Sequence, residues 1–222
     1  MAPPEWIRSA GVVAPSPPTP PEWIARSPLL VDAYSLAEDA HGTQRRASDR
    51  HYFLEHVLEV AELLHEAGFD DEIVAVGLLH DAVERGTLDQ ERLRDEMGAS
   101  IASLVLALSE DPEIASFDRR KASLRRQVEG AGRAAMTVYA ADKLSDIRGL
   151  CRGMETRRGG LEERLGTTVA GMSAHYRESV EMIEAVRPAS PFVPLLRAEM
   201  ARLDLDVLAG PGSVAVGGTA DE

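Results

Sequence analysis

Residues 78–84 read Leu78-Leu79-His80-Asp81-Ala82-Val83-Glu84. A histidine and an aspartate stand side by side inside an apolar segment, where unpaired polar groups are costly. A divalent metal ion would satisfy both, because imidazole nitrogen and carboxylate oxygen are good ligands. On a helix, His80 and Glu84 lie one turn apart, so Glu84 leans toward the same place. The stretch therefore predicts a metal site inside a helical core.

The apolar residues around this stretch recur every three or four positions, which is the period of a helix. Gly68 is placed to end a first helix, and Asp70 or Asp71 to cap a second that runs through residues 80–84 to Gly86. Further helices are expected near 88–96, 99–109, 117–128, 134–150, 161–186 and 192–205. No alternating run requires a strand, so the expected fold class is all-α.

Two residues do not complete a metal site, so further ligands are expected from neighbouring helices. His56 and Asp142 each stand where apolar residues would otherwise pack. With His80 and Asp81 they give two imidazoles and two carboxylates, a set that suits Mn²⁺ or Fe²⁺ with room for water. Taken singly, each residue could be a satisfied buried polar group or a surface charge. The four together favour the metal, because charges are seldom buried unpaired.

Four blocks in this order resemble the hydrolase domain of the RelA/SpoT homologues, a branch of the HD-domain phosphohydrolases. The blocks are 40–46, 56–61, 78–84 and 140–144. The segments 97–105 and 175–177 are similar too, and the resemblance covers about residues 33–203. It implies an HD-domain helical bundle that removes the 3′-pyrophosphate of (p)ppGpp, usually with Mn²⁺, to give GDP or GTP and pyrophosphate.

The resemblance also implies a role for each matched residue. The implied metal ligands are His56, His80, Asp81 and Asp142. Glu84 would position or activate the water that attacks the substrate. The implied substrate-binding residues are Arg46, Lys143, Asp146, Arg120 and Lys121. The alternative for the basic helix near 117–128 is a solvated face, since charge runs usually are solvated.

Several positions depart from the family pattern, among them Thr43, the loop 48–52 and three positions next to expected metal-site residues. Arg85 stands where the family usually has an aspartate, so it either slows catalysis or places a cation on phosphate. Ser145 and Asp146 replace the usual His-Asn pair. A carboxylate at 146 would repel phosphate or accept from a sugar hydroxyl. These departures keep two other functions open: hydrolysis of another nucleotide, such as NADPH or a nucleoside polyphosphate, and non-catalytic nucleotide binding.

The composition narrows the classes of partner. The 222-residue chain has a formal net charge of −13, which argues against binding long nucleic acid or an anionic membrane. A small phosphorylated nucleotide remains compatible, because a metal ion and a few local cations can hold phosphate. No apolar run approaches the ~20 residues of a membrane span. With no signal peptide in view and the single Cys151 interpreted as a core residue, a cytoplasmic location is expected.

Three parts are expected along the chain. Residues 1–27 form a proline-rich flexible tail, 28–207 the HD hydrolase domain, and 208–222 a flexible C-terminal tail. The first tail repeats the motif Pro-Pro-Glu-Trp-Ile, in 3–7 and in 20–24. Because tryptophan often anchors interfaces, this tail could dock a protein partner. The alternative is that one copy folds back onto its own domain.

Overall fold

The computed structural model describes residues 18–156 and 160–209. The helices in these ranges are α1 (Pro28–His41), α2 (Phe53–Glu66), α3 (Asp71–Leu79), α4 (Gln90–Leu108), α5 (Phe117–Ala131), α6 (Arg133–Glu155), α7 (Leu161–Leu165), α8 (Val169–Val186) and α9 (Val193–Ala209). The part of the chain that the structure describes contains no strand, only one isolated bridge between Arg45 and Tyr52. The all-α prediction is confirmed.

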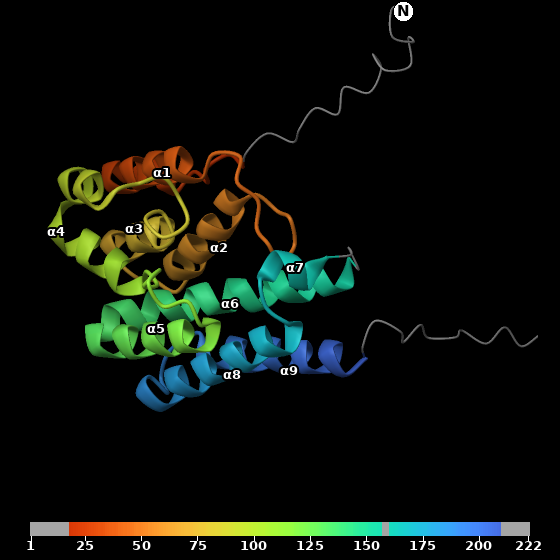
Figure 1. The fold of residues 1–222 in the computed structure, drawn as a ribbon. Coiled ribbons are helices and arrows are strands. Elements are labelled where there is room, and N and C mark those ends of the chain that lie inside the picture. The colour runs from red at the N-terminus through yellow and green to blue at the C-terminus, as the bar shows by residue number, and fades with distance from the viewer. Residues whose placement is uncertain (1–17, 157–159, 210–222) are drawn as a thin grey trace, which may run out of the picture.

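The long helix α6 lies at the centre of the bundle (Figure 1). It packs against α2 and α3 on one side and against α5, α8 and α9 on the other. Most of its length is buried, including the charged residues Asp142 and Lys143. Helices α2 and α3 approach closely at Gly77, where an added Cβ would lie only 2.6 Å from Leu64 Cδ1. The absence of a side chain at Gly77 permits this approach. This packing brings the end of α3 against the middle of α6.

The helix through the dyad is shorter than predicted. Helix α3 ends at Leu79, and residues 80–85 form tight turns, with Ala82 N–H donating to the Leu79 carbonyl at 2.9 Å. The reason is local: His80 Nδ1 lies 2.8 Å from the Gly77 carbonyl, the acceptor that the next helical turn would use. The prediction that the helix continues to Gly86 is therefore wrong.

Glycines also set two other helix boundaries. The two helices expected at 88–96 and 99–109 form α4, which bends at Gly98, where φ is +82°. The single helix expected at 161–186 is in fact α7 and α8. Helix α7 ends at Gly166 in the left-handed conformation, and Thr168 caps α8 by accepting from Gly171 N–H.

The second copy of the repeated motif is part of the folded domain. Ile24 is buried, the Trp23 ring stacks on His65 at 4.4 Å between centroids, and Tyr34 Oη–H donates to the Pro18 carbonyl. The prediction of a flexible tail up to residue 27 is therefore wrong for residues 18–27. The alternative, that one copy of the motif folds back onto its own domain, is correct for the second copy. The first copy lies outside the described residues. At the other end, Leu208 and Ala209 belong to α9, and 210–222 lie outside the described residues.

Replacing Ile24 with alanine should destabilise the protein. Ile24 is 2% exposed and belongs to the hydrophobic core, so its truncation leaves a cavity that costs about 2 kcal/mol or more of unfolding free energy. Urea denaturation would measure the loss. The exposed neighbour Arg26 provides the control, because Arg26→Ala should change stability by less than about 0.5 kcal/mol. Equal midpoints for the two variants would mean that this segment does not contribute to the core.

Among the described residues, no helix combines the length and apolar character that crossing a bilayer requires.

Candidate metal and phosphate site

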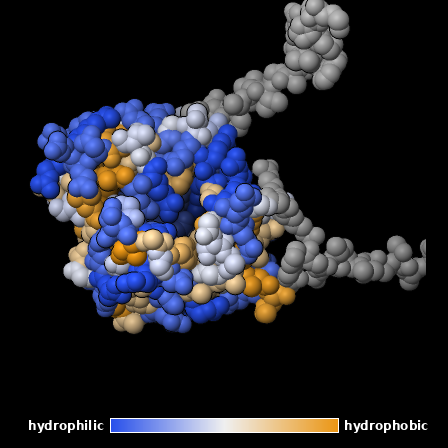
Figure 2. All heavy atoms as spheres, viewed as in Figure 1, coloured by the Kyte–Doolittle hydropathy of each residue, from blue (hydrophilic) through white to orange (hydrophobic). Residues whose placement is uncertain are grey.

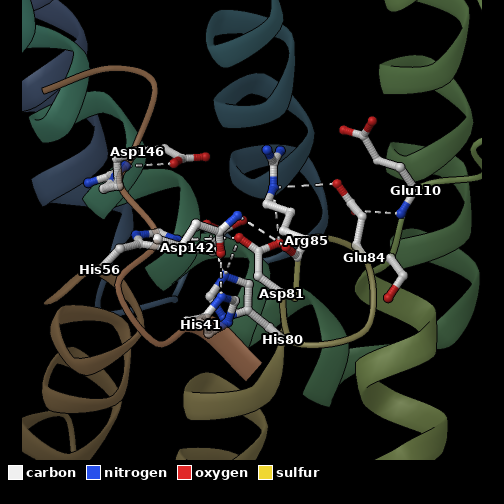
Figure 3. Close-up of polar contacts among 12 residues, drawn as sticks. His41, His56, His80, Asp81, Glu84, Arg85, Glu110, Asp142 and Asp146 are labelled. Atoms are coloured by element: carbon white, nitrogen blue, oxygen red, sulfur yellow. Dashed lines mark hydrogen bonds and ion pairs between the residues drawn. The ribbon is translucent and has the colours of Figure 1, made fainter. Parts of the chain in front are cut away.

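Four predicted ligands converge where α2, the end of α3 and α6 meet (Figure 3). The Nε2 atoms of His56 and His80 each lie 3.4 Å from Asp142 Oδ1. The same two nitrogens lie 3.7 and 3.6 Å from Asp81 Oδ2. All four side chains are at most 13% exposed. Residues up to 86 positions apart thus present two nitrogens and two carboxylate oxygens to one point.

This geometry fits a divalent ion. Ligand atoms about 2.1 Å from a shared ion lie roughly 3–3.5 Å from each other. His56, His80 and Asp142 offer ligand atoms that all lie within 4.8 Å of one another. His80 Nε2 is buried and has no hydrogen-bond partner in the described structure, while His80 Nδ1 is engaged by the Gly77 carbonyl. A buried imidazole nitrogen without a hydrogen-bond partner, aimed at two carboxylates, is the arrangement that a metal ion would satisfy.

The charges in the cluster favour a cation. Burial raises the pKa of Asp142, but the Lys143 ammonium and His80 outweigh burial and hold it well below its usual range. Burial and the Arg46 guanidinium lower the pKa of His56, so this ring is neutral. Burial lowers the pKa of His80, yet Asp81 and Asp142 raise it to about 9. The carboxylates of Asp81 and Asp142 thus share the one positive charge of protonated His80. A divalent ion can displace that proton and balance both carboxylates.

A cavity of about 740 Å³ opens beside the cluster. Hydrophilic side chains surround a hollow in the face shown in Figure 2. Its wall contains nine of the residues predicted from the sequence: Arg46, Asp81, Glu84, Arg85, Arg120, Lys121, Asp142, Lys143 and Asp146. The structure thus brings every predicted site residue to the cavity or to the histidine pair beneath it.

Two predicted substrate-binding residues are held in place by Asp146. Arg46 Nη2 donates to Asp146 Oδ1 at 2.9 Å, and Lys143 Nζ lies 2.7 Å from Asp146 Oδ2 and 2.8 Å from Asp142 Oδ2. Arg46 also lies against α6 at Gly149, where a Cβ would come within 2.6 Å of its Nη1. Asp146 therefore accepts from two cations at the cavity wall.

A second network crosses the cavity and includes Glu110, which sequence reasoning missed. Glu84 Oε2 accepts from Glu110 N–H at 2.7 Å, and Arg85 Nε lies 3.4 Å from Glu84 Oε1 and 3.5 Å from Asp81 Oδ1. The Glu110 carboxylate pairs with Arg120 at 2.6 Å and with Lys121. Burial and Asp81 raise the pKa of Glu84. Nothing in the local pattern around Glu110 marked it, because its partners come from other segments.

His41 is a second residue that the analysis of single positions passed over. It is 3% exposed, its Nδ1 bonds Gln44 Oε1 at 2.9 Å, and its ring stacks on Phe53. Figure 3 places it beside His80. Its Nε2 is buried without a hydrogen-bond partner among the described residues. The signal that could have found it is its place in the 40–46 block.

An HD-domain family model matches residues 33–167, more than half of the chain. The chain belongs to the HD-domain family. A probable chloroplastic GTP diphosphokinase, RSH2 of Oryza sativa subsp. japonica, is 34% identical to this HD-domain chain over 130 residues. The match covers 54% of the chain but only 18% of that plant protein.

A shorter relative matches over more of its own length. The guanosine-3′,5′-bis(diphosphate) 3′-pyrophosphohydrolase MESH1 of Danio rerio is 32% identical over 130 residues, which are 56% of this HD-domain chain and 70% of the fish protein.

Two solved structures share the fold. One is a metazoan ortholog of SpoT, described as hydrolysing ppGpp, with a TM-score of 0.66 and 20% identity over 83% of this chain and 98% of that one. The other, from Listeria monocytogenes EGD-e, has a TM-score of 0.57 and 25% identity over 67% of this chain and 92% of that one.

A buried histidine near the cavity should make stability depend on pH. His175 Nδ1 lies 2.8 Å from Arg125 Nη1, a group that can only donate, so this nitrogen carries no proton. Burial, together with Lys143 and Lys121, lowers the pKa of His175 to about 2. The unfolded chain binds a proton near pH 6.5 that the folded chain excludes. The contribution of His175 is thus present above pH 6.5 and is lost as the pH falls.

We expect the His175→Gln variant to have a flatter stability profile. Between pH 7 and pH 5, wild type should lose about 2 kcal/mol of unfolding free energy more than the variant does. Denaturant titrations at several pH values would measure both slopes. The exposed, non-titrating Ser103 is the control, and Ser103→Ala should retain the wild-type slope. Parallel profiles for wild type and His175→Gln would contradict this interpretation.

Proposed function

We propose that the chain is a metal-dependent phosphohydrolase that removes the 3′-pyrophosphate of guanosine tetra- or pentaphosphate. The observation that carries the proposal is the His56–His80–Asp81–Asp142 cluster at the edge of a large cavity lined with cations. The name of the Danio rerio relative supports the choice of substrate. The chain spans 18% of the plant relative, so activities of that longer protein are not carried over.

His56, His80, Asp81 and Asp142 would hold the ion, for which we propose Mn²⁺, with Fe²⁺ as the alternative. When bound, such an ion supplies a water of lowered pKa and polarises a phosphoryl oxygen. Glu84 would take the proton from the attacking water. Its raised pKa makes the carboxylate a stronger proton acceptor than an ordinary glutamate, and the Glu110 N–H fixes the direction of its carboxylate.

The cations of the wall would stabilise the charge that develops on the phosphoryl oxygens and on the leaving pyrophosphate. Arg85 is well placed for this role. Its Nε is held between Asp81 and Glu84, its side chain is 44% exposed, and it lines the cavity. Lys143 stands beside Asp142, and Arg120 and Lys121 lie farther along the wall, where Glu110 orients both.

Hydrolysis of another nucleotide, such as NADPH or a nucleoside polyphosphate, is the second candidate. The observation that favours it is Asp146, whose carboxylate stands on the cavity wall and accepts from Arg46 and Lys143. A carboxylate there reduces the positive charge available to phosphate and offers an acceptor to a sugar hydroxyl.

A nucleotide panel tests the two candidates. Purified full-length protein with Mn²⁺ would be incubated separately with ppGpp, pppGpp, NADPH and GTP, and the products separated by ion-exchange chromatography. We expect pyrophosphate with GDP from ppGpp, and with GTP from pppGpp. Release of phosphate from NADPH or GTP, with no product from ppGpp or pppGpp, would select the second candidate. No product from any nucleotide, with the ion bound, would contradict hydrolysis.

A further inference from the structure

The imidazole of His56 is supported from behind by a hydrogen-bonded chain that lies outside the cavity. His56 Nδ1 is 2.9 Å from Ser145 Oγ, and Ser145 Oγ–H donates to Glu59 Oε2 at 2.7 Å. Ser145 has no exposed surface. His56 and Glu59 are three residues apart on α2, as are Asp142 and Ser145 on α6, so each pair shares one face of its helix. The two facing helices thus carry both ligands and both supports.

The direction of each hydrogen bond in this chain follows from its far end. Glu59 lies between two guanidinium groups, with Arg148 Nη1 at 3.1 Å from Oε1 and Arg152 Nη2 at 3.7 Å from Oε2. A carboxylate in this position accepts only, so the Ser145 hydroxyl hydrogen points to Glu59. The Ser145 oxygen then offers a lone pair to His56. His56 must therefore donate through Nδ1–H.

The proton on Nδ1 determines what His56 presents to the metal site. With Nδ1 protonated in the neutral ring, Nε2 is a lone pair, and it faces Asp142 Oδ1 at 3.4 Å. His80 Nδ1 also donates, but to the backbone carbonyl of Gly77, which no side-chain substitution removes. His56 alone depends on side chains that can be replaced.

We propose that Ser145 and Glu59 are positioning residues that hold His56 in the Nδ1–H tautomer and aim its Nε2 at the metal ion. The proposal rests on the proposed metal site but not on the identity of the nucleotide. It gives a role to Ser145, one of the positions that depart from the family pattern. Partners of this kind fix the ring and the tautomer of metal-binding histidines, and their loss weakens metal binding.

The test uses full-length Ser145→Ala and Glu59→Gln. In metal-free protein, ¹⁵N NMR of the imidazole nitrogens reports the His56 tautomer, and competition with a chelator measures Mn²⁺ affinity. Ser145→Ala should bind Mn²⁺ about 10- to 100-fold more weakly and lose the pure Nδ1–H form. Glu59→Gln should show a smaller loss, because its amide can donate to Ser145 and release the hydroxyl toward His56 Nδ1.

Two control variants remove the same groups elsewhere. Ser179→Ala deletes another fully buried hydroxyl, which bonds Tyr139. Glu199→Gln removes the other carboxylate that pairs with Arg148. Both should keep the wild-type tautomer and Mn²⁺ affinity. The second control also separates positioning from simple loss of negative charge.

The proposal is overturned if folded Ser145→Ala retains the Nδ1–H tautomer and the wild-type affinity. If Ser145→Ala does not fold, the His56 tautomer and the Mn²⁺ affinity of Glu59→Gln decide, and wild-type values for both overturn the proposal. Glu59 is 24% exposed, so this variant tolerates the change more readily. Failure of the proposed function would look different. Wild type would then bind Mn²⁺ with the expected tautomer but hydrolyse no ppGpp.

Discussion

Asp142→Ala should abolish both metal retention and turnover. Asp142 Oδ1 lies 3.4 Å from the Nε2 atoms of both His56 and His80. Its removal therefore takes away the carboxylate ligand at the centre of the proposed metal site. Among the four proposed ligands, Asp81 would be the one carboxylate left to balance the charge of the ion. We expect kcat/KM for ppGpp to fall at least ~10³-fold, as loss of the metal's contribution to catalysis requires.

Elemental analysis after dialysis would measure the metal retained by Asp142→Ala, and product formation would measure turnover. Asp204→Ala is the matched control, because Asp204 is a carboxylate outside the site that pairs with Arg177. The control should retain both properties. Circular dichroism shows whether the fold is intact, and Asp142→Asn keeps the side-chain volume if alanine disturbs the packing. A folded variant with full metal content and activity would defeat the site assignment.

Glu84→Gln should lower kcat about 10²- to 10⁴-fold while leaving the metal in place, which is the range for loss of a proton acceptor. Glu84 lies outside the histidine cluster, with its carboxylate bound by the Glu110 N–H and close to Arg85. Glutamine keeps the shape and one acceptor oxygen but cannot take a proton from water. The effect therefore belongs to the chemical step and not to metal binding.

The pH profile gives Glu84→Gln a second readout. Burial and Asp81 raise the pKa of Glu84, so wild-type activity should fall on the acid side at a pH above the usual range of glutamate. This fall in activity at low pH, the acidic limb of the profile, should disappear in the variant. Glu129→Gln, an exposed change on α5, should leave both kcat and the limb unchanged. A Glu84→Gln enzyme with wild-type kcat and an intact acidic limb would exclude Glu84 as the proton acceptor.

Local patterns in the chain were sufficient for the fold class and for the candidate ligands. The three-to-four-residue period around Val57 and Val76 predicts helices, since it depends only on neighbours in sequence. His80, Asp81 and Asp142 stood out because polar residues in apolar helices need partners.

Other features depended on contacts between distant segments. The end of α3 at Leu79 follows from one side-chain hydrogen bond that competes with the backbone, which periodicity does not record. Trp23 packs on His65 of α2, a partner more than 40 residues away that no local pattern indicates.

Neighbouring residues in the sequence also did not predict which charges pair in the cavity wall. Arg46 and Asp146 are 100 residues apart, and their ion pair exists only after α6 has packed against the segment before α2. Glu110 meets Glu84, which stands 26 residues earlier, and Arg120 and Lys121, which stand 10 and 11 residues later. Residue types and spacing therefore determine which groups are present and on which helix. Packing over long chain distances determines which charges meet, and so how the site is balanced.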